Sequence, residues 1–447
     1  MEYMFSNKDL RKMIFPLIIE QFLNISIGMI DSVMVAGTGE AAVSAVSLVD
    51  TVMILLVNMF TALAAGGGIV AGHAIGRKNR EEGCDVAEQT LLFTVSMAII
   101  IMTAMYLFKN WIFSAVFGDI SDELLKNCNI YYSIMAASIP FLALYNVGAS
   151  TCRSIGNSKL PMMMSFIMNI VHLIGNYILI NIYGLGVAGA ATSSLFSRIF
   201  SGVAIVLLLR NKKLFIHFRS FKIKLKKDVL KKIMRIGIPY GIESSLFQIG
   251  KILVISLVAE LGIASITANA VAGTIGSFAL LLGSSLNVAM SIVTAQCVGT
   301  GDFEQVKYYT KKIFKYAYGL LAVMNILIML GLPVILRLYD LTDETTLLVR
   351  QLTFYHCICV MTIWPLSFMI PPVLRAANDV AYCMVVSVAS MWIFRIAFSY
   401  FLVKNLELGI LGVWIAMTVD WVIRGVLFGI RYKSGKWWHK YRVNLRM

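Results

Sequence analysis

The chain has 447 residues, of which 59% are apolar and only 14% are charged, and its mean hydropathy is +0.79. No soluble domain of this length needs so apolar a composition, and a β-barrel would show short alternating segments rather than long apolar runs. The formal net charge of +15 would favour nucleic acid in a soluble chain, but most Lys and Arg lie in loops between apolar runs. We therefore predict an all-α polytopic membrane protein and expect no nucleic-acid partner.

Twelve apolar runs are long enough to cross a bilayer as helices. The predicted spans are 13–36, 49–72, 88–109, 130–150, 160–182, 185–209, 236–259, 266–292, 313–335, 352–373, 382–403 and 408–430. Loops on one side of the membrane hold most of the Lys and Arg, including Arg153, Arg375 and the long basic loop after the sixth span. Cytoplasmic loops carry this excess, so both termini are predicted to be cytoplasmic, in a cell membrane and specifically a prokaryotic inner membrane.

The second half of the chain repeats the first at an offset of 223 residues. Pro16 and Glu20 correspond to Pro239 and Glu243, and several Gly and Ala positions follow the same offset. Each repeat holds six spans, an even number, so the two repeats enter the membrane in the same orientation, and a substrate cavity is expected between them. We predict an N-terminal six-helix lobe, a cytoplasmic basic linker, a C-terminal six-helix lobe and a cytoplasmic tail, at 1–210, 211–235, 236–431 and 432–447.

The first span carries polar residues within an apolar run. Glu20, Asn24 and Asp31 are separated by four and then seven residues, which places all three near one side of a helix. A carboxylate at the bilayer centre costs about 2.5–3.5 kcal/mol on insertion scales. A helix that carries two of them is expected to turn them toward a water-filled, protein-lined pathway.

Several motifs resemble those of the multidrug and toxic compound extrusion (MATE) transporters, and the resemblance extends over essentially the whole chain. The matching stretches include Asp31-Ser-Val-Met-Val-Ala-Gly, Arg153-Ser-Ile-Gly-Asn, Gly186-Val-Ala-Gly-Ala-Ala and Gly237-Ile-Pro-Tyr-Gly-Ile-Glu. The resemblance implies a secondary antiporter that exports mostly cationic, amphipathic organic compounds in exchange for H⁺ or Na⁺. It implies no enzyme activity and no cofactor beyond the coupling ion.

The resemblance also implies a cation-coupling site in the first lobe. The family's first-span Asp is kept as Asp31, its fifth-span Asn-x-x-x-Asp pair falls on His172 and Asn176, and its sixth-span Thr falls on Ser194. The second carboxylate is therefore missing. Asp31, Asn176 and Ser194 still offer three oxygens to Na⁺, whereas His172 offers a group that titrates near working pH. We favour H⁺ over Na⁺ as the coupling ion.

A second set of polar residues in the spans is expected to take part in substrate binding or coupling: Glu20, Asn24, Asn169, Glu243 and Lys251. The family often keeps the seventh-span acid, here Glu243. A pair of Glu243 with Lys251 or with Arg395 is expected to reduce the attraction of the second lobe for cations.

Two other functions were weighed. A flippase for lipid-linked precursors, of the same superfamily, would show a cationic cavity for phosphate, and Lys251, Arg198 and Arg395 keep that alternative open. An enzyme is not expected, because the five histidines form no metal-spaced motif and no catalytic set converges. The expected partners are a small, cationic organic substrate and membrane lipid, and the chain is expected to be a monomer.

Overall fold

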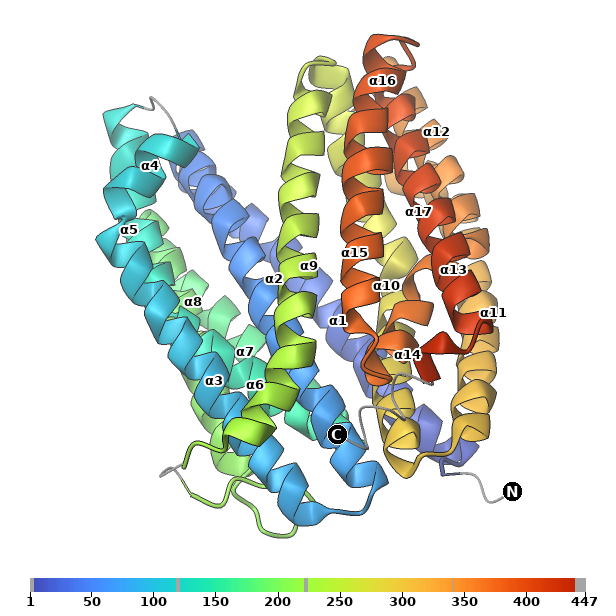
Figure 1. The fold of residues 1–447 in the computed structure, drawn as a ribbon. Coiled ribbons are helices and arrows are strands. Elements are labelled where there is room, and N and C mark those ends of the chain that lie inside the picture. Colours follow the sequence, from blue (N-terminus) through green and yellow to red (C-terminus); the bar gives the residue numbers. More distant parts are fainter. Residues whose placement is uncertain (1–3, 118–120, 221–223, 340, 439–447) are drawn as a thin grey trace. The chain divides into compact units, whose positions relative to one another are not determined.

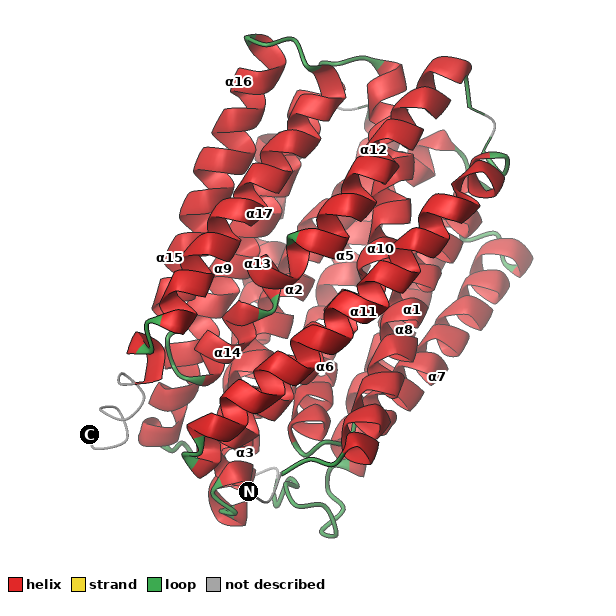
Figure 2. Ribbon diagram, turned by 90° about the vertical axis from the view of Figure 1, so that its right-hand side faces the viewer, coloured by secondary structure: helices red, strands yellow, loops and turns green. Residues whose placement is uncertain are grey.

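Every regular element in the described part of the chain is a helix. The computed structural model describes residues 4–117, 121–220, 224–339 and 341–438, apart from the side chains at 29, 31–33, 36 and 115–117. No strand occurs within these ranges, as Figure 2 shows. The chain forms two compact units, Asn7–Gly241 and Ile242–Met447 with Met1–Ser6, and the division falls inside one long helix, α9 (Lys227–Ala259).

The N-terminal unit, drawn from blue to green in Figure 1, contains eight α-helices and one π-helical turn before α9. They are α1 (Asn7–Ala36), α2 (Glu40–Gly76), α3 (Arg80–Leu107), α4 (Lys109–Phe117), α5 (Asp122–Ala137), α6 (Ile139–Ser154), α7 (Lys159–Asn176), η1 (Tyr177–Ile182) and α8 (Gly186–Leu208).

The C-terminal unit continues from α9 in the same order of long and broken helices. Its elements are α10 (Ile263–Thr300), α11 (Phe303–Leu336), α12 (Asp343–Thr362), α13 (Trp364–Phe368), α14 (Ile370–Ala376), α15 (Val380–Ser390), η2 (Met391–Ala397), α16 (Phe398–Lys404) and α17 (Gly409–Lys433).

Each of the twelve predicted spans coincides with one helix or with consecutive helices, which confirms the predicted fold class. Nine helices of the described residues are long and apolar enough to cross a membrane, or up to eleven when each of two bent pairs counts as one span. The remaining span is α1, a 30-residue helix that contains Pro16.

The two bent pairs occupy the fourth span of each unit, where the chain bends by 43° between α5 and α6 and by 61° between α12 and α13–α14. Pro140, Pro365 and Pro371 lie at the starts of the new segments, where proline cannot continue the preceding hydrogen-bond ladder.

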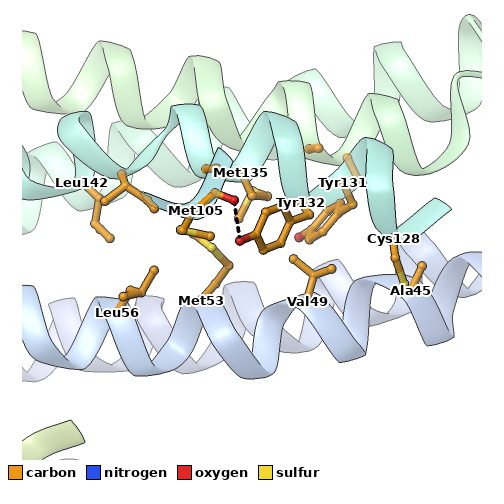
Figure 3. Close-up of a cluster of buried hydrophobic side chains, with 14 of the residues drawn as sticks. Ala45, Val49, Met53, Leu56, Met105, Cys128, Tyr131, Tyr132, Met135 and Leu142 are labelled. Carbon is orange, nitrogen blue, oxygen red and sulfur yellow. Dashed lines mark hydrogen bonds between the residues drawn. The ribbon is translucent and has the colours of Figure 1, made fainter. Parts of the chain in front are cut away.

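A hydrophobic core lies among α2, α3, α5 and α6 in the N-terminal unit. Figure 3 shows Ala45, Val49, Met53 and Leu56 of α2 facing side chains of α5, and they recur at the helical spacing of three or four residues. The buried hydroxyl of Tyr132 donates a hydrogen bond to the backbone carbonyl of Met105, at 3.2 Å. The one polar atom of this large ring is thus satisfied away from water. A second core joins α9, α10, α12 and α17 in the C-terminal unit.

The approach of α9 to α2 within the N-terminal unit depends on glycine. A Cβ added at Gly66 would lie 2.6 Å from the Cα of Gly237, so the two backbones meet where neither helix has a side chain. Gly237 opens the motif that resembles the family's seventh span. That motif therefore has a packing role as well as the acid it carries.

The basic segment between α8 and α9 is folded onto α3. Ile216 and Phe218 are buried, and the Arg219 guanidinium pairs with Asp85 and, at 2.8 Å, with Glu88. Hydrogen bonding to Glu88 and Asp85 raises the pKa of Arg219 above its usual value. Part of the positive charge that the sequence places in this loop is therefore neutralised by acids of the same unit.

Replacing Arg219 by alanine is expected to release this segment from α3, because Asp85 and Glu88 lose a shared cation. Hydrogen exchange of residues 209–220, measured on the full chain in detergent, should become faster by at least tenfold. Lys213→Ala is the control, since Lys213 is an exposed neighbour in the same loop. Equal protection in wild type and Arg219→Ala would show that Ile216 and Phe218 alone hold the segment.

Candidate functional site

The residues predicted to couple the cation lie on three helices of the N-terminal unit. Helix α1 carries Asp31 in its last two turns, α7 carries His172 and Asn176 one turn apart, and α8 carries Ser194. The side chain of Asp31 lies outside the described residues. The geometry of the site is therefore described from α7 and α8.

His172 and Ser194 lie side by side. The Nε2 atom of His172 is 3.0 Å from Oγ of Ser194, and Oγ of Ser193 donates to the backbone carbonyl of His172 at 2.7 Å. The two helices approach closely because Gly175 lies opposite Ser193, where an added Cβ would come within 2.5 Å of the Ser193 oxygen. The structure thus brings together two of the four residues that the resemblance implied.

A polar stripe runs along α7. Ser165, Asn169, His172 and Asn176 are spaced by four, three and four residues, which places them on one face of the helix. Asn169 and Asn176 are buried, at 9% and 1% exposure, and the Ser165 hydroxyl donates to the side-chain oxygen of Asn24 at 3.3 Å. The stripe therefore links α7 to α1. The sequence analysis missed Ser165, although its spacing to Asn169 was visible.

Glu20 forms an ion pair with Arg153. The Glu20 side chain is 2% exposed, and the guanidinium of Arg153 reaches it from the last turn of α6. A buried carboxylate with a cationic partner is held in place rather than offered to a passing ligand. This contact supports a structural role for Glu20 over the predicted role in substrate binding.

Glu243 forms the equivalent ion pair with Arg375 in the C-terminal unit. Nη2 of Arg375, in α14, lies 2.8 Å from Oε1 of Glu243, and both residues are almost fully buried. The expected partner, Lys251 or Arg395, was therefore wrong. Lys251 lies eight residues along the same helix, about 12 Å away by helix rise, whereas α14 ends beside Glu243.

The two ion pairs are related by the sequence repeat. Glu20 and Glu243 are offset by 223 residues and Arg153 and Arg375 by 222. The sequence analysis counted both arginines as basic loop residues, but each lies in the last turn of a helix and neutralises an acid. The paired offsets were the available signal: an acid and a base that both recur at one spacing are candidates for contact.

Lys251 and Arg395 face a cavity of about 270 Å³ within the C-terminal unit, together with His356 and Trp414. Arg198, the third cation considered for a phosphate cavity, belongs to the N-terminal unit, where its Nη1 donates to the Ser138 hydroxyl at 2.7 Å. Among the described residues, no group of three or more His, Cys, Asp or Glu side chains could hold a metal ion.

The family model described as MatE matches the chain twice, over residues 16–178 and 239–401. The chain belongs to the MATE family. The two matched segments begin 223 residues apart, which is the offset of the internal repeat. MATE proteins are transporters, so the expectation that the chain is not an enzyme is confirmed.

Relatives match over nearly the full length. The probable multidrug resistance protein YoeA of Bacillus subtilis is 28% identical, over 90% of this chain and 88% of its own. The probable multidrug resistance protein NorM of Thermotoga maritima is 22% identical, over 96% and 93% of the two chains.

Two solved structures illustrate the shared fold. One is described as the outward-facing conformation of a multidrug resistance MATE family transporter, with a TM-score of 0.88, 18% identity and 96% coverage of both chains. The other is a transporter from Pyrococcus furiosus described as having a binding pocket of reversed polarity, with a TM-score of 0.87, 19% identity and coverage of 96% and 95%. The fold of this MATE chain is therefore that of solved transporters.

Proposed function

We propose that this MATE transporter is a multidrug efflux antiporter that exports cationic or amphipathic organic compounds in exchange for H⁺ or Na⁺. The observation that carries the proposal is the double match of the family model, supported by full-length relatives that are named as probable multidrug resistance proteins. The protein acts as a monomer in the cell membrane, with both termini in the cytoplasm.

The coupling ion acts on Asp31 and on the His172–Ser194 pair. Protonation neutralises this site and favours one of two conformations, so that a substrate bound from one side is released on the other. Such coupling requires the ion to bind the two conformations unequally. H⁺ is the preferred ion because the second carboxylate of the family pattern is absent and an imidazole stands 3.0 Å from the serine hydroxyl.

The test is efflux of a fluorescent organic cation, such as ethidium, from cells that overproduce the protein. Asp31→Asn cannot change charge and is expected to reduce efflux at least tenfold, whereas Asp9→Asn, at the start of the same helix, is the matched control. Equal efflux by wild type and Asp31→Asn, at equal protein levels, would remove the role given to Asp31.

A flippase for lipid-linked precursors is the second candidate. The observation that favours it is a pair of cations, Lys251 and Arg395, beside one cavity of the C-terminal unit. Its substrate would carry phosphate and a long lipid chain, so failure of efflux together with movement of a phosphate-bearing lipid between leaflets would favour this function.

A further inference from the structure

The cavity of the C-terminal unit has cationic and apolar walls. Lys251 of α9 and Arg395 of η2 line it, and Val254, Val413 and Trp414 provide much of the remaining surface. Trp414 is held by a hydrogen bond from its Nε1 to the side-chain oxygen of Asn269, at 3.1 Å. At about 270 Å³ the space is somewhat smaller than a typical drug pocket and suits the head group of a larger compound.

The two cations that face the cavity have no carboxylate partner among residues 4–438 that the structure describes. No ion pair involves Lys251 or Arg395, and the buried Nε of Arg395 has no hydrogen-bond partner there. By contrast, the buried Glu243 and Arg375 of the same unit neutralise each other. The unit can thus pair its buried charges, and at this cavity it leaves positive charge uncompensated.

A third cation adds to the field. The charged groups of Lys251, Arg395 and Arg424 lie 5.4, 5.6 and 5.5 Å from the centre of the Phe247 ring. The ring face attracts cations and helps to hold them near one another. The nearby acid is Asp420, which lies 3.9 Å from Arg424 and accepts a hydrogen bond from Ser390 at 2.6 Å. One carboxylate among three cations leaves an excess of positive charge.

A guanidinium and an ammonium at one cavity are suited to an oxyanion. Arginine presents planar donors that match carboxylate and phosphate oxygens, and lysine adds a mobile point charge. The same walls would repel an organic cation. An apolar body with an acidic group satisfies both the charge and the apolar lining, which an inorganic anion alone does not.

We propose that this cavity is a binding subsite for the anionic group, carboxylate, sulfonate or phosphate, of an amphipathic compound. The inference rests on the proposed efflux function for its physiological meaning and narrows the substrate class to compounds that carry an acidic group. Lys251 and Arg395 bind the anion, and Trp414 with its apolar neighbours contacts the body of the compound.

The test is equilibrium binding of 1-naphthyl phosphate to the purified full chain in nanodiscs of zwitterionic lipid, without any ion gradient. Lys251→Gln and Arg395→Gln are each expected to weaken binding at least tenfold, and Arg395→Lys, which keeps the charge, less than threefold. Lys433→Gln, an exposed lysine of the same unit, is the control and should bind as wild type does.

Two further measurements decide the source of the anion and the sign of the site. Anionic phosphatidylglycerol in the nanodiscs should compete with the probe if a lipid head group occupies the site, and leave binding unchanged if a soluble compound does. Naphthylmethyl-trimethylammonium should bind at least tenfold more weakly than the phosphate. Equal binding of both probes, or wild-type binding by folded Lys251→Gln, would overturn the proposal. Ethidium efflux, measured separately, keeps this outcome distinct from failure of the efflux function.

Discussion

Replacing Arg375 by methionine is expected to lower the free energy of unfolding by about 3–5 kcal/mol, because Glu243 is left as an uncompensated buried charge. Glu243→Gln removes that charge. The double variant, Glu243→Gln with Arg375→Met, should therefore be more stable than Arg375→Met alone. The measurement is denaturant-induced unfolding of the full chain in detergent, with all variants at one pH.

Arg337→Met is the matched control for this experiment, because Arg337 is an exposed arginine of the same unit. It should stay within about 0.5 kcal/mol of wild type, as surface substitutions usually do. The equivalent change in the other unit, Arg153→Met, should cost less, because the side chain of Arg153 is 21% exposed against 9% for Arg375. Strictly additive effects of Glu243→Gln and Arg375→Met would contradict the pairing.

Replacing Asn176 by aspartate should make stability depend on sodium. This change restores the carboxylate of the family pattern at a position that is 1% exposed, and an uncompensated buried charge costs about 3–5 kcal/mol. Sodium bound by this carboxylate, with Asp31 and Ser194, would supply the compensation. The wild-type chain, with one acid fewer, should show the same thermal midpoint in sodium and in choline chloride.

Thermal unfolding in the two salts measures this effect. Asn211→Asp, in the loop after α8, is the control and should unfold alike in both. If Asn176→Asp is destabilised equally in sodium and in choline, then Asn176 does not face a cation site, and the residue-by-residue transfer of the family pattern to α7 is wrong at this position.

The helices were predictable because bilayer thickness sets their length and apolar composition marks their positions. The bends of the fourth spans and the exact ends of the helices were less predictable, since they depend on local proline positions and on packing. The order of the two repeats was visible in Pro16 and Pro239, and the matched ranges of the family model show the same offset.

The site was only partly predictable. The contact of His172 with Ser194 followed from the family pattern, because one helical face of α7 must meet α8. The partner of Glu243 did not follow, since the search was confined to cations inside spans and Arg375 was assigned to a loop. A long arginine at a helix end can reach several residues into a membrane protein, and charge counts along the chain do not reveal this.

The most direct test of the account is transport by the purified wild-type chain in liposomes, with ethidium as substrate and one gradient imposed at a time. The account predicts ethidium movement opposite to an imposed proton gradient, lost when the gradient is collapsed, with little movement under sodium alone. Movement under sodium alone would contradict proton coupling, and no movement under either gradient would contradict the proposed antiport itself.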